Sequence, residues 1–239
     1  MLFTLETDDG DFLELRDARH GNEFGAYIME EGISGWYGSP APREEVFGRA
    51  ETDGDGMPVM LTQGARTVTL ECVGNFESAI DAANYVSQIT SLMCKPLTLT
   101  CHDGGGRKHA KGFISDDPEI MPYPDEESLR FTLIITCPDP FRYADPIEYP
   151  VQNGKATVIN TGNAPTWPKI KILGTSFSAK FDGHEVDWFG SAYALVDFRD
   201  PSKTLGVTLD DVFQIPPGIH TIEVSASGNA SVIVESAWR

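Results

Sequence analysis

Apolar and polar residues alternate along most of this 239-residue chain, and this pattern predicts a protein built almost entirely from β-strands. The one clear departure lies between Arg66 and Cys101. Residues 66–73 alternate with a period of two, which predicts a half-buried strand, and residues 97–101 alternate again. Between these strands, apolar residues recur every three or four positions. This spacing predicts a single amphipathic helix over residues 76–93.

The predicted helix has an apolar stripe that we expect to be buried. The stripe consists of Phe76, Ala79, Ile80, Ala83, Val86, Ile89 and Met93. Asn75 is a suitable residue to cap the first turn, and Pro96 disfavours continuation of the helix. Because the rest of the chain predicts only strands, the stripe must pack on a sheet, so we expect one helix lying across a β-sandwich. Ile80→Asp should then destabilise the fold by several kcal/mol.

A proline-rich stretch divides the chain. Residues 129–137 have the longest apolar strand pattern, and prolines follow at positions 138, 140, 146 and 150. Proline at this density cannot continue a central strand and stiffens a connector. We therefore predict a first domain of residues 1–143 and a second of residues 144–239. After Lys155 only short strands and turns follow, which favours an antiparallel sandwich.

Charge and cysteine content narrow the function classes. The chain has 36 acidic and 18 basic residues, a net charge of −18 that is spread along the sequence. Such an excess disfavours binding to free nucleic acid or to anionic membranes. No apolar run reaches transmembrane length, and the first residues lack the pattern of a secretion signal. The four cysteines form no C-x-x-C pair, so we expect buried free thiols and assembly in a cytoplasm.

Three features resemble chemical sites but each lacks a necessary part. The acidic loop of residues 51–56 has calcium-ligand spacing, but its twelfth position is Thr62, which supplies no bidentate carboxylate. The glycine-rich residues 102–109 lack the Gly-Lys-Ser/Thr sequence and the following helix of a P-loop. No carboxylate pair and no histidine beside a serine or cysteine forms a recognisable catalytic set. We predict no enzyme activity, no metal and no cofactor.

Four segments, taken in order, resemble the distal tail protein (Dit) family of long-tailed, non-contractile bacteriophages. They are the strand–helix–strand of residues 66–101, the Pro-Asp-Pro junction of residues 137–143, the N-x-G…P-x-I-x-I pattern of residues 160–172, and the Pro-Gly turn of residues 215–222. The resemblance spans nearly the whole chain. It implies a mainly β protein with an N-terminal β-sandwich, which carries one α-helix, and a C-terminal galectin-like antiparallel β-sandwich.

The resemblance also implies a structural role without chemistry. Six copies would form a ring at the tail tip of a virion, assembled in the cytoplasm of the bacterial host. The ring would contact the major tail tube protein, the tail-associated lysin or hub protein and, in some phages, receptor-binding proteins. DNA would pass through the channel without specific binding, and no membrane would be involved. We assign the subunit contact, as a region, to Trp36, Tyr37, Arg43 and Arg66.

A carbohydrate-binding module or adhesin is the alternative function. The second domain contains Trp167, Trp188 and Trp238, and exposed tryptophans can stack on sugars. The histidine, asparagine and arginine set with which true galectins read sugars is missing, however, and tryptophan in a small sandwich more often belongs to the core. The exposure of these side chains separates the two interpretations.

Overall fold

The computed structural model describes residues 1–17, 24–43, 47–48, 53, 55–56 and 61–239. The chain forms two compact units, Met1–Phe141 together with Arg239, and Arg142–Trp238. The division falls just before Arg142, whereas we predicted it after Tyr143. Strand β13 (Arg142–Tyr143) pairs with β23 (Ala237–Trp238), and this pairing joins both residues to the second unit.

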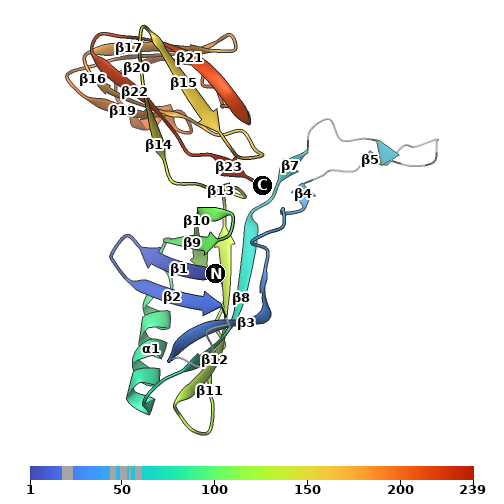
Figure 1. The fold of residues 1–239 in the computed structure, drawn as a ribbon. Helices are drawn as coiled ribbons and strands as arrows, with labels where there is room; N and C mark the ends of the chain where they lie inside the picture. The colour runs from blue at the N-terminus through green and yellow to red at the C-terminus, as the bar shows by residue number, and fades with distance from the viewer. Residues whose placement is uncertain (18–23, 44–46, 49–52, 54, 57–60) are drawn as a thin grey trace. The chain divides into compact units, whose positions relative to one another are not determined.

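The first unit is a ladder of strands that closes on itself (Figure 1). Its strands are β1 (Leu2–Thr7), β2 (Phe12–Asp17), β3 (Gly25–Ser34), β8 (Arg66–Asn75), β9 (Leu97–Asp103), β10 (Gly106–Ile114), β11 (Met121–Pro122) and β12 (Ser128–Cys137). The order is β12-β8-β3-β2-β1-β9-β10, and β10 pairs back to β12. Among the strand pairings that the structure describes in this unit, only the short one of β2 with β3 is parallel. The prediction of a mainly β protein with one α-helix is confirmed for the described residues.

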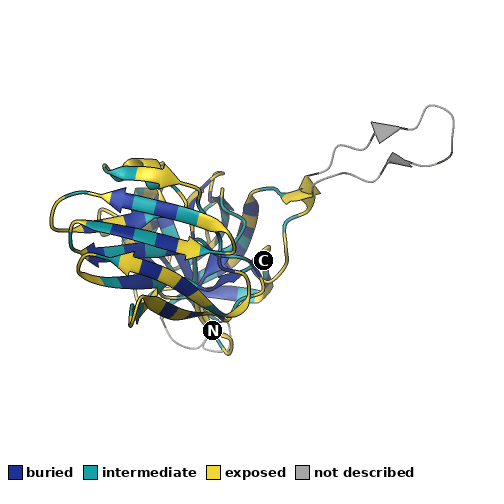
Figure 2. Cartoon of the chain, turned by 90° about the horizontal axis from the view of Figure 1, so that it is seen from above, coloured by how far each residue is buried: buried dark blue, intermediate teal, exposed yellow. Residues whose placement is uncertain are grey.

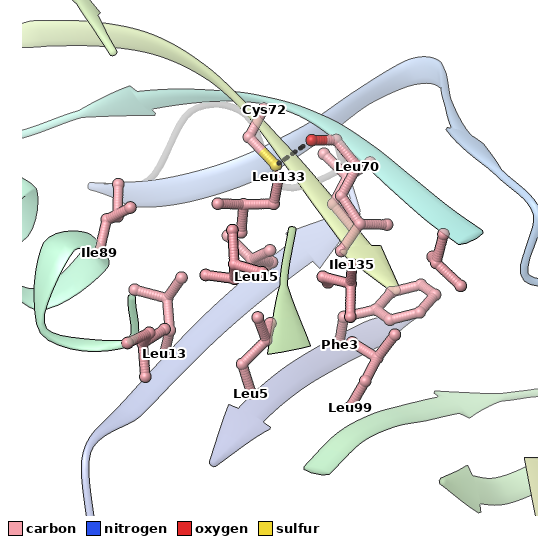
Figure 3. Close-up of a cluster of buried hydrophobic side chains, with 14 of the residues drawn as sticks. Phe3, Leu5, Leu13, Leu15, Leu70, Cys72, Ile89, Leu99, Leu133 and Ile135 are labelled. Atoms are coloured by element: carbon pink, nitrogen blue, oxygen red, sulfur yellow. Dashed lines mark hydrogen bonds between the residues drawn. The ribbon is translucent and has the colours of Figure 1, made fainter. Parts of the chain in front are cut away.

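Alternation along these strands places their apolar side chains inside the ladder (Figure 3). The cluster contains Phe3, Leu5, Leu13, Leu15, Leu70, Cys72, Leu99, Leu133 and Ile135. Each of these side chains is less than 2 % exposed. Burial of apolar area on this scale is the main stabilising term of the first unit.

Helix α1 (Ala79–Ser91) covers this core with part of the predicted stripe: Ile89 is buried, and Phe76, Val86 and Met93 pack against the core. Ser78 caps it, since its Oγ accepts a hydrogen bond from the Asp81 amide at 3.2 Å, so the Asn75 cap prediction is wrong. Asn75 is instead the last residue of β8. Ile80 is 73 % exposed, which overturns its predicted burial and the predicted cost of Ile80→Asp.

The side of α1 that faces the core is set by Tyr85, which the predicted stripe omitted. The Tyr85 ring packs 5.0 Å from the ring of Phe76 and 6.0 Å from that of Phe131. This contact turns Ala82 and Ile89 inward, and Leu92 follows them at the same spacing just after the helix. Ala79 and Ala83 are exposed as a result, whereas the predicted burial of Ile89 is correct.

Three of the four cysteines are buried as free thiols, as predicted: Cys72, Cys101 and Cys137. Burial raises the pKa of the Cys101 and Cys137 thiols to about 11. The prediction is wrong for Cys94, which is exposed. This residue lies just after the helix with a φ of 60°, so it belongs to the turn and not to the helix face.

Between β3 and β8 the chain forms two short two-stranded ribbons that are separate from the main sheet of the first unit. Strand β4 (Pro42–Arg43) pairs with β7 (Thr62–Gln63), and β5 (Phe47–Gly48) pairs with β6 (Asp55–Gly56). The loop of residues 51–56, for which we considered calcium binding, lies largely outside the described residues.

The second unit is an antiparallel sandwich. One sheet has the order β14-β22-β16-β19 and the other β15-β21-β17-β18-β20. The strands are β14 (Ile147–Pro150), β15 (Lys155–Asn160), β16 (Lys169–Leu173), β17 (Ser176–Phe181), β18 (His184–Phe189), β19 (Ala194–Asp197), β20 (Val207–Asp210), β21 (Gly218–Ala226) and β22 (Asn229–Val234). Buried and exposed positions alternate along them, so each sheet turns one face to a shared core (Figure 2).

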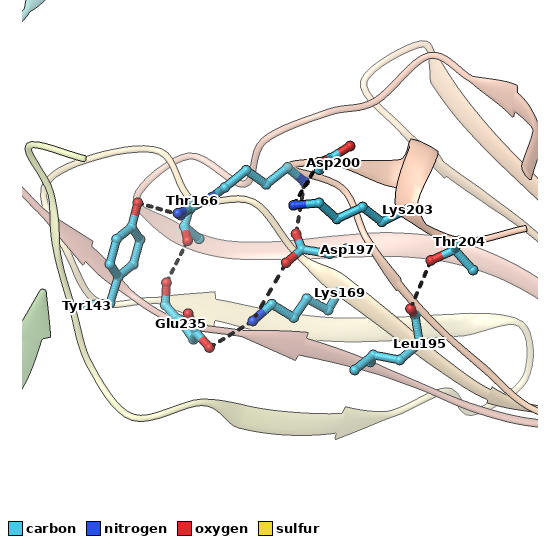
Figure 4. Close-up of polar contacts among 10 residues, drawn as sticks. Tyr143, Thr166, Lys169, Leu195, Asp197, Asp200, Lys203, Thr204 and Glu235 are labelled. Atoms are coloured by element: carbon cyan, nitrogen blue, oxygen red, sulfur yellow. Dashed lines mark hydrogen bonds and ion pairs between the residues drawn. The ribbon is translucent and has the colours of Figure 1, made fainter. Parts of the chain in front are cut away.

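Charged side chains on the outer face of the four-stranded sheet pair with one another (Figure 4). Lys169 Nζ lies 3.2 Å from a Glu235 carboxylate oxygen and 3.8 Å from one of Asp197. Arg199 donates a hydrogen bond of 2.6 Å to the Tyr143 hydroxyl and stacks over its ring. Among the described residues, no helix has the length and hydropathy needed to cross a membrane.

Candidate assembly surface

The aromatic segment that follows β3 is fixed to the first unit by a close backbone approach. Gly35 has a φ of 75°, and a Cβ there would lie 1.8 Å from the carbonyl oxygen of Thr67. Only glycine fits, so the chain can cross directly over β8. The next side chain, Trp36, is 1 % exposed and meets the Phe3 ring edge to face at 5.4 Å.

Arg66 forms hydrogen bonds at both ends of this segment, and we call this set of contacts the Arg66 clasp. Its guanidinium Nη1 donates hydrogen bonds to the carbonyl oxygens of Gly35 at 2.5 Å, Trp36 at 3.0 Å and Gly38 at 2.7 Å. Its Nε donates to the carbonyl oxygen of Pro140 at 2.8 Å. Arg66 is 1 % exposed and is the first residue of β8. One buried side chain therefore joins the segment that leaves the ladder to the strand on which it returns.

Tyr37 points the other way and presents its ring to solvent, with 56 % of the residue exposed. Its hydroxyl donates a hydrogen bond of 2.9 Å to a carboxylate oxygen of Asp103 at the end of β9. Partial burial of the hydroxyl and the adjacent carboxylate raise the pKa of Tyr37. The side chain is therefore a neutral donor with a fixed orientation.

The four residues to which we assigned the subunit contact thus have two roles in the structure. Trp36 and Arg66 are buried within the subunit and hold the segment in place. Tyr37 and Arg43 are exposed, and Arg43 lies on the ribbon formed by β4 and β7, opposite Thr62. Only Tyr37 and Arg43 have side-chain surface to offer to a neighbouring subunit, and that contact stays a prediction.

Burial of Trp188 weakens the argument that exposed tryptophans of the second unit bind sugars. Trp188 is 3 % exposed, stacks with Phe177 in the core, and donates its indole N–H to the Leu205 carbonyl oxygen at 2.9 Å. Trp167 and Trp238 are half-buried. Among the residues that the structure describes, no group of three or more histidine, cysteine or carboxylate side chains is arranged to hold a metal ion.

Formal charge is divided unevenly between the two units. Residues 1–141 contain 25 acidic and 10 basic side chains, a balance of −15, whereas residues 142–238 contain 11 acidic and 7 basic side chains, a balance of −4. The acid excess, which we described as spread along the chain, belongs mainly to the first unit. The field of this unit repels polyanions such as DNA.

Comparisons with known proteins find similarity in structure only. No family model matches the chain, and no curated protein matches it. Among solved structures, the SPP1 Dit protein (gp 19.1), described as a paradigm of the hub adsorption apparatus in phages that infect Gram-positive bacteria, aligns with a TM-score of 0.68 and 16% identity. The alignment covers 99% of this chain and 99% of that chain.

Two structures of the phage p2 baseplate in its activated conformation also align. The structure with Sr gives a TM-score of 0.57 and the structure with Ca gives 0.55, each at 13% identity. Each alignment covers 98% of this chain and 97% of the other. Both units are included in these matches, so the chain as a whole has the fold of the SPP1 Dit protein and of a chain of the p2 baseplate.

Proposed function

We propose that this chain is a structural subunit of a phage tail tip. The observation that carries the proposal is the match of both units, in one alignment, to the SPP1 Dit protein. A shared fold does not by itself give a shared function. The order of the sequence segments quoted above is an independent argument for the same family.

In the proposed assembly, six copies form a closed ring through their first units. Such a ring uses a heterologous interface, in which each subunit offers two different surfaces. Tyr37 is suited to one of these surfaces because the Arg66 clasp fixes the segment that carries it, and Arg43 is held on β4 by its pairing with β7. An ordered segment loses less conformational entropy when it binds than a flexible loop does.

The charge of the first unit suits a ring around a DNA channel. A balance of −15 for each copy would repel phosphate groups and let DNA pass without binding. The ring would join the major tail tube protein to the tail-associated lysin or hub protein and to receptor-binding proteins. These partners come from the resemblance and from the solved structures, in which such subunits belong to an adsorption hub and a baseplate.

The test is the native mass and shape of the purified protein. Light scattering should give six times the subunit mass of 26.2 kDa, or a multiple of that mass where rings associate further, and negative-stain images should show rings. A monomer at all concentrations up to tens of micromolar would contradict the proposal. A monomer that binds a glycan array, with binding lost on Trp167→Ala, would support the adhesin instead.

The regional assignment of the contact has a separate test. Arg43→Glu should reduce the fraction of rings, since it reverses a charge on the surface proposed to meet the neighbouring subunit. Lys111→Glu is the matched control, because it makes the same charge change at an exposed position on β10. If both variants form rings as the wild type does, the assignment to Arg43 is wrong while the ring itself stands.

A further inference from the structure

One end of the second unit is formed from stretches without any charged residue. Residues 172–179, 188–196, 204–209 and 224–234 contain no Asp, Glu, Lys, Arg or His, although 23% of the chain is charged. Strand interiors account for the buried half of these positions. They do not account for the exposed half, where charged residues are normally common.

Hydrogen bonds bring the four stretches together at this end. The bonds run from the Phe189 amide to the Gly206 carbonyl at 2.8 Å, from the Gly190 amide to the Thr175 carbonyl at 2.9 Å, from the Gly174 amide to the Ala192 carbonyl at 3.1 Å, and from the Thr175 amide to Ser227 Oγ at 2.8 Å. The Thr204 hydroxyl adds a bond of 3.2 Å to the Leu195 carbonyl (Figure 4). Turns that are distant in sequence therefore form one continuous surface.

This surface is tightly packed beneath its exposed side chains. A Cβ on Gly206 would lie 2.1 Å from the Phe189 carbonyl oxygen, and a Cβ on Gly228 would lie 2.1 Å from that of Leu173. The buried Trp188 indole holds the Leu205 carbonyl at 2.9 Å. The turns can approach so closely only because they contain glycine. The side chains that they carry are therefore presented in fixed positions.

Five large apolar side chains in or beside these turns are exposed to solvent, and a sixth in the same stretches, Leu209, is exposed on β20 opposite Asp187. The five are Leu173, Phe189, Tyr193, Leu195 and Leu205, with exposed fractions of 56, 67, 54, 43 and 93 %. We call these five residues the neutral apolar end. Contiguous exposed apolar surface marks sites of protein contact, and charge depletion with aromatic enrichment is typical of the centre of an interface.

We propose that the neutral apolar end binds the same surface on a second copy of this chain. Two copies with a charge of −18 each, carried mainly by the first units, repel one another. The charged side chains nearest to the neutral apolar ends, Lys171 opposite Leu195 and Lys203 two residues before Leu205, are each paired with a carboxylate. A contact between two such ends keeps the first units out of the interface and brings few unpaired like charges face to face, so its electrostatic cost is low. A two-fold contact of this kind is self-complementary. A different protein, in contrast, would meet no unpaired charged group on this surface that could make the contact specific.

This inference goes beyond the proposed ring, which uses the first unit. It adds a second contact between copies, made by second units alone. The two contacts can exist independently. A chain that forms no ring can still pair through its neutral apolar ends, and a ring can form without such pairing.

Leu205→Asp tests the contact directly. Leu205 is almost fully exposed, so the substitution should leave the thermal unfolding of the second unit unchanged. In the interface it places two like charges in an apolar contact, and the association of second units should weaken at least about tenfold. Ile219→Asp is the matched control, since Ile219 is 70 % exposed on β21 and lies outside the four stretches.

Light scattering on the full chain gives the result. The wild type and Ile219→Asp should show twice the mass of Leu205→Asp, whether the smaller species is a ring or a single chain. An equal mass for all three proteins would overturn the inference and would leave the ring proposal untouched.

Discussion

Replacing Arg66 by methionine should strongly destabilise the first unit. The substitution keeps the length and most of the volume of the side chain but removes the guanidinium. Four carbonyl oxygens, those of Gly35, Trp36, Gly38 and Pro140, then lose a hydrogen bond of between 2.5 and 3.0 Å. Because the site is buried, water cannot replace these bonds without loosening the segment.

The expected cost is about 3 kcal/mol. The four bonds are made by three N–H groups, because Nη1 carries only two hydrogens, and each hydrogen bond to a charged group contributes about 1.5–3 kcal/mol, so together they account for about 4.5–9 kcal/mol. Removal of the ion also removes the cost of its burial, which is several kcal/mol. The difference is about 3 kcal/mol, a large share of the roughly 5–15 kcal/mol by which a domain is stable. Arg66→Lys should cost less than Arg66→Met but should still destabilise the unit, since an ammonium keeps the charge and three donors but lacks the planar geometry that matches the four carbonyls.

Hydrogen exchange followed by mass spectrometry during a urea titration measures this loss. Peptides from the first unit should open at lower urea in Arg66→Met, and the peptide with residues 34–39 should exchange fastest. Peptides from residues 142–238 serve as an internal reference, because the second unit is a separate compact body. Equal protein concentrations are needed, since assembly itself stabilises the chain. If the free energy of unfolding of the first unit in Arg66→Met lies within about 0.5 kcal/mol of the wild-type value, the stabilising role of the Arg66 hydrogen bonds is refuted.

Three further predictions follow from the exposure and charge of single residues. Ile89→Ala should lower the free energy of unfolding of the first unit by about 2–4 kcal/mol in urea denaturation, whereas Ile80→Asp on the same helix should change it by less than about 0.5 kcal/mol. A thiol reagent should label Cys94 alone in the native protein, and all four thiols in urea. The hydrogen bond with Asp211 and its charge raise the pKa of His184, so their stabilising effect is complete below about pH 6.5 and is lost as the pH rises through the folded value. An NMR titration should show this pKa falling in Asp211→Asn.

The periodicity of the sequence was sufficient for the fold class but not for the face of the helix. Residues 66–73 and 129–137 were recognised as strands because alternation is a strong signal where one face is buried. On the helix, two apolar stripes share Val86 and Ile89, and counting apolar residues favours the stripe that contains Ile80. The aromatic contacts of Tyr85 with residues distant in sequence decide the other way.

The candidate surface was less predictable for a related reason. Trp36 and Arg66 stand in the correct region, but their roles depend on four carbonyl groups that converge only in the folded chain. A single arginine at the start of a strand is usually solvated, and no local pattern distinguishes a clasp from a surface charge. Exposure of Tyr37 beside the buried Trp36 likewise follows from the turn at Gly35, which periodicity does not reveal.

The neutral apolar end, in contrast, has a signal in the sequence that only the fold makes meaningful. Four uncharged stretches are visible in the residues alone, but each resembles an ordinary strand with its turn. Only the exposed residues of these stretches indicate a contact surface, and which residues are exposed is known only once the strands have paired. Leu205 shows this well: in a sequence it is one more leucine, whereas in the structure it is 93 % exposed on a turn fixed by Trp188. Because the backbone of this turn is already fixed, covering Leu205 would bury apolar surface at little cost in backbone entropy, which is why pairing between copies is the property of this chain to measure first.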